Sequence, residues 1–295
     1  MRTRRIISYA LFEPTRLYDE RAWDRHRGVA ARYWFNLPAI ALCNQALYEG
    51  FETRVHVARR CVERPQFPVL DLLTERVPGF HYVVVEDDYR EFEPSLWRMM
   101  PFWAPDTEIL LCRDVDSLPN ATEWGATLRF LRGGTGMHSI RAHPHHREPL
   151  RLLAGLCGFR PERLLGRVPA HDFAAYAAMA RGVAREDDQE LLNRVFARDD
   201  AANATELLDS PIDEQHERAP YPHRPGAPSG RVATTEQGFR VLEWVRHERL
   251  TPWAGAPCSA RGPALERLLQ RLGRDDLRRA LHRDAALKRT YLGKG

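Results

Sequence analysis

Cysteine is scarce in this chain, and the few cysteines form no recognisable pattern. The 295 residues include an odd number of them, and no two stand in a C-x-x-C pair. Disulfide scaffolds and zinc ribbons need paired, closely spaced cysteines, so neither is expected, and a reducing compartment fits the composition best. The five are Cys43, Cys61, Cys112, Cys157 and Cys258.

Long apolar runs are also missing. No stretch approaches the ~20 apolar residues that a membrane span needs. The opening "MRTRRIISYALFEPTR" has a basic start and a short apolar run, but Glu13 and Pro14 interrupt that run and no small-residue cleavage site follows. We therefore expect a soluble, cytoplasmic protein without a membrane span.

The net charge of the chain is only +4, so no strong overall field predicts a nucleic-acid partner. The charge is unevenly distributed, however. From Arg261 to the end there are ten Lys/Arg and four Asp/Glu, a local charge of +6. This tail also carries leucines at helical spacing, which predicts two short basic amphipathic helices.

The apolar pattern predicts an α/β fold. Alternating or continuous apolar segments predict strands at 4–12, 52–60, 81–87 and 108–114, and "TGMHSIRAHP" at 135–144 predicts another. Helices are predicted at 32–51, 94–103, 121–134 and 187–199. This alternation is typical of a mostly parallel sheet flanked by helices. We expect one α/β domain over 1–235 and a basic, mostly helical extension over 236–295 that packs on or beside it.

The segment "EILLCRDVDSLPN" places two carboxylates, Asp114 and Asp116, directly after a buried strand. In open α/β sheets, ligands lie outside the carboxyl ends of the strands. Mg²⁺ or Mn²⁺ is commonly held there by one or two carboxylates, together with phosphate oxygens and water. The pair therefore suits a metal that bridges the protein to a diphosphate. The alternative is that both aspartates only cap a turn before Pro119.

Four segments in a fixed order carry a family resemblance. "WRMMPFWAPDTEILLCRDVDS", "HSIRAHPHH", "GLCG" and "DDQELLN" together resemble nucleotide-sugar-dependent glycosyltransferases of the GT-A fold. The resemblance is to a bacterial family with R-D-x-D-S, R-D-H-P-x-H, G-G-M-W-G and D-Q-x-x-L-N segments, and it covers about residues 5–215. It implies a GT-A-like (Rossmann-like) catalytic domain, a nucleotide-sugar donor, Mn²⁺ or Mg²⁺ and an acceptor that the sequence does not identify.

The resemblance also implies roles for the residues around the aspartate pair. Asp114 would contact the sugar or ribose, and Asp116 would bind the metal, with Asp114 as a further carboxylate of that site. Arg113 precedes the pair as in the family, and Arg98 belongs to a W-R pair on the nucleotide side. Trp97 is more simply explained by core packing.

The histidine-rich segment would contact the diphosphate or an acceptor hydroxyl. Arg141, His143 and His146 match the family segment, but Ala142 stands where an aspartate is usual. A zinc site is disfavoured, because the spacing does not suit a helix-borne H-x-x-x-H pair. An inert solvated turn remains the alternative.

The glycine segment would lie next to the sugar. Gly155 and Gly158 flank a turn where side chains would obstruct a bound sugar, and Gly158 could equally end a helix. Leu156 and Cys157 replace the Met and Trp of the family, a change that could reshape the sugar pocket.

The segment "EDDQELLN" supplies the candidate catalytic residues. Asp188, or otherwise Asp187, would be the general base of an inverting enzyme. Gln189 would lie against the sugar ring in a retaining enzyme, so the stereochemistry stays open. The alternative is an acidic helix N-terminus that is stabilised only by the helix dipole.

The family's late metal-binding histidine is absent, since "LLDSP" has Leu208 at that place. Asp209 is our candidate for the third ligand, with His216 or His223 as the alternatives.

Two other functions compete with sugar transfer. A metal-dependent nucleotidyltransferase also uses paired aspartates, but it normally has a glycine-rich loop after the first strand, and this chain has no glycine before Gly28. A catalytically weak or inactive sugar- or nucleotide-binding relative is favoured by Ala142 and Leu208. Hydrolysis of the nucleotide sugar in Mn²⁺ would distinguish an enzyme from a binder.

Overall fold

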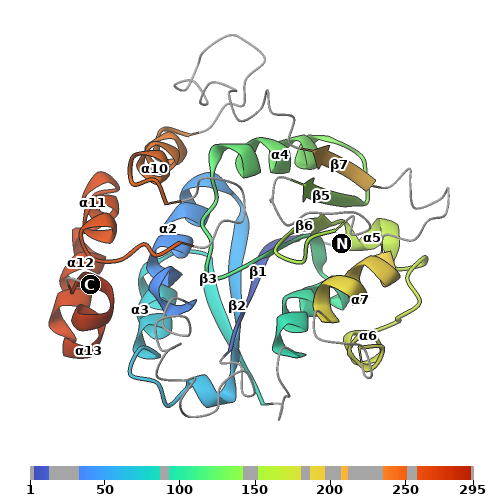
Figure 1. Cartoon of the computed structure of the whole chain (residues 1–295), viewed down its shortest axis with the longest axis horizontal. Helices are drawn as coiled ribbons and strands as arrows, with labels where there is room; N and C mark the ends of the chain where they lie inside the picture. The colour runs from blue at the N-terminus through green and yellow to red at the C-terminus, as the bar shows by residue number, and fades with distance from the viewer. Residues whose placement is uncertain are drawn as a thin grey trace, which may run out of the picture.

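The structure, a computed structural model, describes residues 3–12, 33–86, 93–141, 152–180, 187–196, 207–211, 235–250 and 258–293. Its centre is one sheet of seven described strands in the order β3-β2-β1-β4-β6-β5-β7, with helices on both faces (Figure 1). All strands run in the same direction except β6, which is antiparallel to β4 and β5. The fold is therefore α/β with a mostly parallel central sheet flanked by helices, as predicted. The strands are β1 (Arg4–Leu11), β2 (Phe51–Ala58), β3 (Phe80–Val85), β4 (Thr107–Arg113), β5 (Met137–Arg141), β6 (Leu156–Phe159) and β7 (Leu207–Pro211).

Two elements beside the first strands differ from the prediction. β2 and β3 are parallel and are joined through α3 (Pro68–Arg76), which we did not predict. Parallel neighbours need a crossover, and here a nine-residue helix that buries Val69, Leu70 and Leu73 provides it. The segment predicted as a helix at 94–103 is η2 (Glu93–Trp103), a 3₁₀ helix that contains Pro101. A proline within a helix removes one backbone hydrogen bond, which disfavours the α form there.

Two strands were also missed. β6 was predicted as a turn because of its glycine, and β7 was not predicted at all. Both are too short for apolar alternation to be visible in the sequence. In contrast, α4 (Ala121–Arg132) ends at Gly133 as predicted, and α7 (Asp187–Phe196) confirms the described part of the helix predicted at 187–199.

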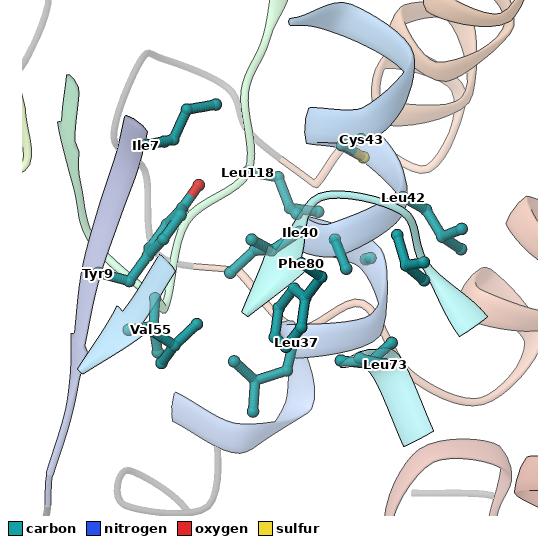
Figure 2. Packing of buried hydrophobic residues seen from close by; sticks show 14 of the residues in the cluster. Ile7, Tyr9, Leu37, Ile40, Leu42, Cys43, Val55, Leu73, Phe80 and Leu118 are labelled. Atoms are coloured by element: carbon teal, nitrogen blue, oxygen red, sulfur yellow. The ribbon is translucent and has the colours of Figure 1, made fainter. Parts of the chain in front are cut away.

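Apolar side chains pack on both faces of the sheet. On one face, Ile7, Tyr9 and Val55 contact α2 (Leu37–Leu47), which buries Leu37 and Ile40 (Figure 2). The other face is covered by η2, α5 (Pro161–Leu164), α6 (Phe173–Ala178) and α7. Consecutive residues of a strand point to opposite faces, so the continuous apolar runs of β1 and β4 supply both layers.

The C-terminal helices extend the first of these layers. The structure has α10 (Glu236–His247), α11 (Pro263–Arg271), α12 (Asp275–Arg283), α13 (Ala285–Leu287) and η3 (Lys288–Leu292). α10 and α11 pack on α2, and α12 packs on α3 (Figure 1). The two amphipathic helices predicted after Gly262 are thus confirmed as α11 and α12. The division into a catalytic domain and an extension stays a prediction. No helix in the described part of the chain is long and apolar enough to cross a bilayer.

Candidate functional site

The aspartate pair lies at the topological switch point of the sheet. From β1 the chain builds β2 and β3 on one side, whereas β4 is on the other side of β1. Crevices at such points, outside the carboxyl ends of the strands, are the usual ligand sites of open α/β sheets. β4 ends at Arg113, and Asp114 accepts two hydrogen bonds on its backbone oxygen from Ser117, from N at 3.3 Å and from Oγ at 3.2 Å. Asp114 and Asp116 therefore begin a tight turn, and both are half-buried.

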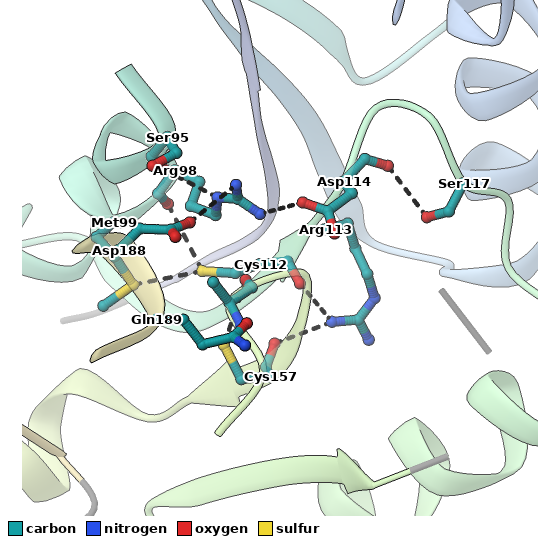
Figure 3. Close-up of polar contacts among 11 residues, drawn as sticks. Ser95, Arg98, Met99, Cys112, Arg113, Asp114, Ser117, Cys157, Asp188 and Gln189 are labelled. Carbon is teal, nitrogen blue, oxygen red and sulfur yellow. Dashed lines mark hydrogen bonds and ion pairs between the residues drawn. The ribbon is translucent and has the colours of Figure 1, made fainter. Parts of the chain in front are cut away.

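Arg98 joins Asp114 to Asp188. Its Nη1 contacts the Asp114 carboxylate, and its Nη2 lies 3.3 Å from Oδ2 of Asp188 (Figure 3). Nε donates to the backbone oxygen of Ser95 at 2.8 Å, which fixes the guanidinium. The two carboxylates come from segments far apart in the sequence, the end of β4 and the first turn of α7. Arg98 thus unites three predicted site residues in one cluster.

Charge and burial compete within this cluster. Burial acts to lower the pKa of Arg98, but the carboxylates of Asp114 and Asp188 outweigh it and raise that pKa. Burial raises the pKa of Asp188, Arg98 opposes the rise, and the nearby charge of Asp114 adds to it. The Asp188 side chain keeps 24% of its surface exposed, so it is accessible to a ligand. A carboxylate with a raised pKa is a stronger base than an ordinary aspartate.

Gly155 lies against the Asp114 carboxylate. A Cβ atom built on Gly155 would be 1.9 Å from Oδ2 of Asp114 and 2.3 Å from its Cγ. The glycine was predicted to leave room for a bound sugar, and in the structure it leaves room for the carboxylate that Arg98 holds. Gly158 is a strand residue whose Cβ would meet Leu111 at 2.7 Å, so it serves core packing rather than ending a helix.

The D-Q-x-x-L-N helix holds the segment that contains Gly155. Gln189 accepts on Oε1 from the backbone N–H of Ala154 at 3.2 Å. Asn193 pairs with both backbone groups of Leu152, each at 2.8 Å. Two members of the segment therefore hold the residues that lead into β6.

Arg113 has an internal role. Its side chain is 4% exposed and pairs with Glu123, which is 2% exposed, at 2.5 Å. Nη1 donates to the backbone oxygens of Cys112 and Cys157, at 2.8 and 2.9 Å, and Nη2 donates to Oγ1 of Thr127 at 3.1 Å. Because these donors are used inside the protein, we do not retain Arg113 as a nucleotide-binding residue. Through Glu123 and Thr127, Arg113 connects α4 to the end of β4.

Several family-derived positions lie in the core. Leu156 and Cys157 are 2% and 0% exposed, so their side chains do not line an open sugar pocket as we had suggested. Cys157 faces Cys112 across the β4–β6 pair. Trp97 is 3% exposed and belongs to the core, which confirms the packing interpretation.

Residues 258–260, near the C-terminus, contact the turn that contains Asp116, and we did not predict this contact. The backbone N–H of Cys258 donates to the backbone oxygen of Asp116 at 2.7 Å. Asn36, which is fully buried, donates to the Cys258 oxygen at 3.1 Å and accepts from the N–H of Ala260 at 2.8 Å. Burial raises the pKa of the Cys258 thiol to about 12, with the Asp116 charge as a second cause. The sequence gives no sign of this contact, because the partners are more than 140 residues apart.

The remaining predicted residues are described only in part. Arg141 ends β5, and Asp209 is in β7 opposite Ser139, but their side chains lie outside the described residues. The same holds for the side chain of Asp187, the first residue of α7. The other positions outside the described residues are Ala142, His143, His146, His216 and His223.

The described residues do not by themselves show a metal site at the aspartate pair. They hold no group of three or more His, Cys, Asp or Glu side chains that could bind a metal alone. Mg²⁺ and Mn²⁺ need only one or two carboxylates when phosphate oxygens and water complete the shell. Binding of Mn²⁺ or Mg²⁺ by Asp116 and Asp114 stays a prediction.

Comparison with known proteins gives a limited result. No protein-family model matches the chain, and no curated protein matches it. Among solved structures it is similar to 4-diphosphocytidyl-2C-methyl-D-erythritol synthase from Anaerococcus prevotii, with 10% identity, a TM-score of 0.40 and coverage of 83% of this chain and 99% of that one. It is also similar to the glycosyltransferase GlyE of Streptococcus pneumoniae, with 11% identity, a TM-score of 0.41 and coverage of 72% and 46% of the respective chains. At these values the similarity assigns no activity to this chain.

Proposed function

We propose that this protein is a glycosyltransferase that moves a sugar from a nucleotide-diphosphate donor to an acceptor hydroxyl or amine. The observation that carries the proposal is the Arg98 cluster, in which Asp114 and Asp188 meet at the switch point of the sheet. The order of the four family-like segments supports the same function. The donor sugar and the acceptor stay open.

Asp116 and the three residues of the Arg98 cluster each have a proposed role. Asp116 would hold Mn²⁺ or Mg²⁺, which when bound supplies positive charge to the departing diphosphate. Asp114 would accept hydrogen bonds from the sugar or ribose. Its carboxylate is held by Arg98 and occupies the place that a side chain at Gly155 would fill. Asp188 would face the reacting carbon and accept a proton from the acceptor. Arg98 keeps the two carboxylates close together despite their mutual repulsion.

A thermal-shift panel tests the proposal. UDP-, GDP-, ADP- and dTDP-sugars are added to the full chain with and without Mn²⁺. A ligand that binds only the folded state, at a hundred times its dissociation constant, stabilises it by ~2.7 kcal/mol. We expect at least one nucleotide sugar to stabilise the wild type, and Asp116→Ala to reduce that effect. Glu190→Ala, which removes an exposed carboxylate from α7, is the matched control.

Product analysis separates the competing functions. Release of a nucleoside diphosphate from the nucleotide sugar supports sugar transfer. Release of pyrophosphate from a nucleoside triphosphate and a sugar phosphate would instead identify a nucleotidyltransferase. Binding without any turnover would identify a sugar- or nucleotide-binding relative. If no nucleotide stabilises the protein under any metal condition, the proposal is wrong.

A further inference from the structure

The C-terminal helices carry four exposed cations that have no partner among the described residues. Most other basic side chains of this region pair with a carboxylate: Arg267 with Glu248, Arg271 with Glu243, Arg274 with Asp276, and Arg278 with Asp275. No ion pair or side-chain hydrogen bond within the described part of the chain engages the four that remain. These four, which we call the basic face, are Arg279, Arg283, Lys288 and Arg289.

The helices turn the basic face away from the core. In α12, Leu277 and Leu281 are fully buried. Arg279 follows Leu277 by two residues, about 200° around the helix, so it points away from the core. In η3, Tyr291 is fully buried, and Arg289, two residues before it, is exposed. α12 contacts both α13 and η3, so the cations project from neighbouring helices at one end of the molecule (Figure 1).

The carboxylates nearest in sequence to the basic face are engaged elsewhere. Asp275 lies 3.3 Å from Nε of Arg278. Asp284, between α12 and α13, accepts from the backbone N–H groups of Ala286 and Leu287, at 2.8 and 2.9 Å. Unpaired like charges repel one another, so the fold gains nothing from their proximity. The counter-charge of the basic face has to come from solvent ions or from a partner.

The chemistry of the basic face fits a layer of anionic lipid headgroups better than a protein. A specific protein interface has an apolar or aromatic centre. The large apolar side chain that is exposed in the described part of the chain is Val83, which is on β3 and not in these helices. Leu277, Leu281 and Tyr291 are core residues, so they are not free to enter a bilayer. A headgroup layer needs only positive charge from the protein.

A nucleic acid is the less suitable polyanion. Proteins that bind single strands combine a basic groove with exposed aromatic side chains on which the bases stack. Between 258 and 293 the aromatic side chain is that of Tyr291, which is fully buried. The basic face therefore offers charge without a surface for stacking.

We propose that the basic face docks this protein on a membrane surface that contains anionic lipids. The contact is electrostatic and reversible, because it inserts no apolar side chain. α12 packs on α3, on the opposite face of the sheet from α7, so a docked molecule keeps the Arg98 cluster open to ligands. The proposal is independent of the proposed function, because docking needs neither a nucleotide sugar nor a metal.

Sedimentation of the full chain with vesicles tests the proposal. The anionic vesicles contain about 30% phosphatidylglycerol in phosphatidylcholine, and the neutral vesicles contain phosphatidylcholine alone. We expect the wild type to sediment with the anionic vesicles in about 0.05 M NaCl and to stay in solution with the neutral ones. Salt at about 0.5 M should abolish the binding, because it shortens the range of the attraction.

Two variants locate the contact. The test variant combines Arg279→Gln, Arg283→Gln, Lys288→Gln and Arg289→Gln. The control variant removes the same charge from exposed positions elsewhere, through Arg5→Gln, Arg59→Gln, Arg132→Gln and Arg163→Gln. Each cation near an anionic surface strengthens binding about fivefold, so the test variant should bind at least about a hundredfold more weakly. The control variant should bind nearly as the wild type does.

A third variant and thermal unfolding separate charge from structure. Arg279→Lys, Arg283→Lys and Arg289→Lys together keep the charge and should keep the binding. All variants should unfold at the temperature of the wild type, because the basic face has no partner among the described residues.

Three results would overturn the proposal. The first is a wild type that does not sediment with anionic vesicles at low salt, even if it binds an oligonucleotide or poly-glutamate. The second is a test variant that binds as the wild type does. The third is an equal loss in the test and control variants, because overall charge and not the basic face would then account for the binding.

Discussion

Gly155 and Asp114 are in direct contact, and the space that a side chain at 155 would occupy is filled by the Asp114 carboxylate. A Cβ atom there would be 1.9 Å from Oδ2. This contact places the end of β4 and the start of β6 in a fixed relation at the candidate site. The glycine is required by this close approach and not by a left-handed backbone, since its φ is outside that region.

Gly155→Ala should therefore displace the Asp114 carboxylate from Arg98. Forcing one extra methyl group into a packed site typically costs ~1–3 kcal/mol. We expect a loss of stability of that size and a larger loss of nucleotide-sugar binding, measured by urea unfolding and by calorimetry. Gly166→Ala is the control, because no atom lies within 4 Å of the Cβ that it adds. Equal behaviour of the two variants would contradict the contact.

The buried pair of Arg113 and Glu123 should be important for stability. Both side chains are almost fully buried, and removal of one partner leaves an uncompensated buried charge. Loss of one partner from such a pair usually costs ~3–5 kcal/mol. We expect Glu123→Gln to destabilise the fold within that range in chemical unfolding. The double variant Arg113→Met/Glu123→Gln should be more stable than Glu123→Gln alone, and a further loss of stability would refute the pairing.

The raised pKa of Asp188 should make its contribution to stability depend on pH. The folded state holds the Asp188 proton more tightly than the unfolded state, whose pKa is near 3.8. Stability from this group is therefore complete below pH 3.8 and is lost as the pH rises through the folded pKa. Relative to Asp188→Asn, the wild type should gain stability as the pH falls from neutral toward 4. Urea titrations at several pH values measure this, and Glu190→Gln on the same helix should show no comparable trend.

Protonation of His56 should change the stability in the opposite direction, so that stability falls as the pH falls. It is 3% exposed, and its ring nitrogens have no hydrogen-bond partner among the described residues. Burial, with a smaller effect of Arg54, lowers its pKa to about 3. The unfolded state takes up the proton first, so the wild type should lose about 1.4 kcal/mol per pH unit below the ordinary histidine pKa near 6.5. His56→Leu should flatten this slope, whereas His247→Leu, at an exposed position, should leave it intact. An equal slope in wild type and His56→Leu would refute the prediction.

The sequence by itself determined the fold class and the place of the aspartate pair. Continuous apolar runs showed β1 and β4, and two acids directly after a buried strand must emerge at the carboxyl edge of the sheet. Helical spacing showed α4, α7, α11 and α12. These features depend on local periodicity, which a single sequence displays. Short elements such as β6 and β7 have too few residues to show a period, so they were missed.

Only the tertiary structure decided which polar groups meet. Arg98 contacts Asp188 across 90 residues, and Asn36 binds the segment at Cys258 across 222. Arg113 and Asp114 are neighbours in sequence, yet the Arg113 side chain enters the core and the Asp114 side chain reaches the site, because β4 ends at Arg113 and the chain turns at Asp114. Contacts of this kind are set by how the layers pack and by where charge can be compensated, and no local pattern in the chain encodes them.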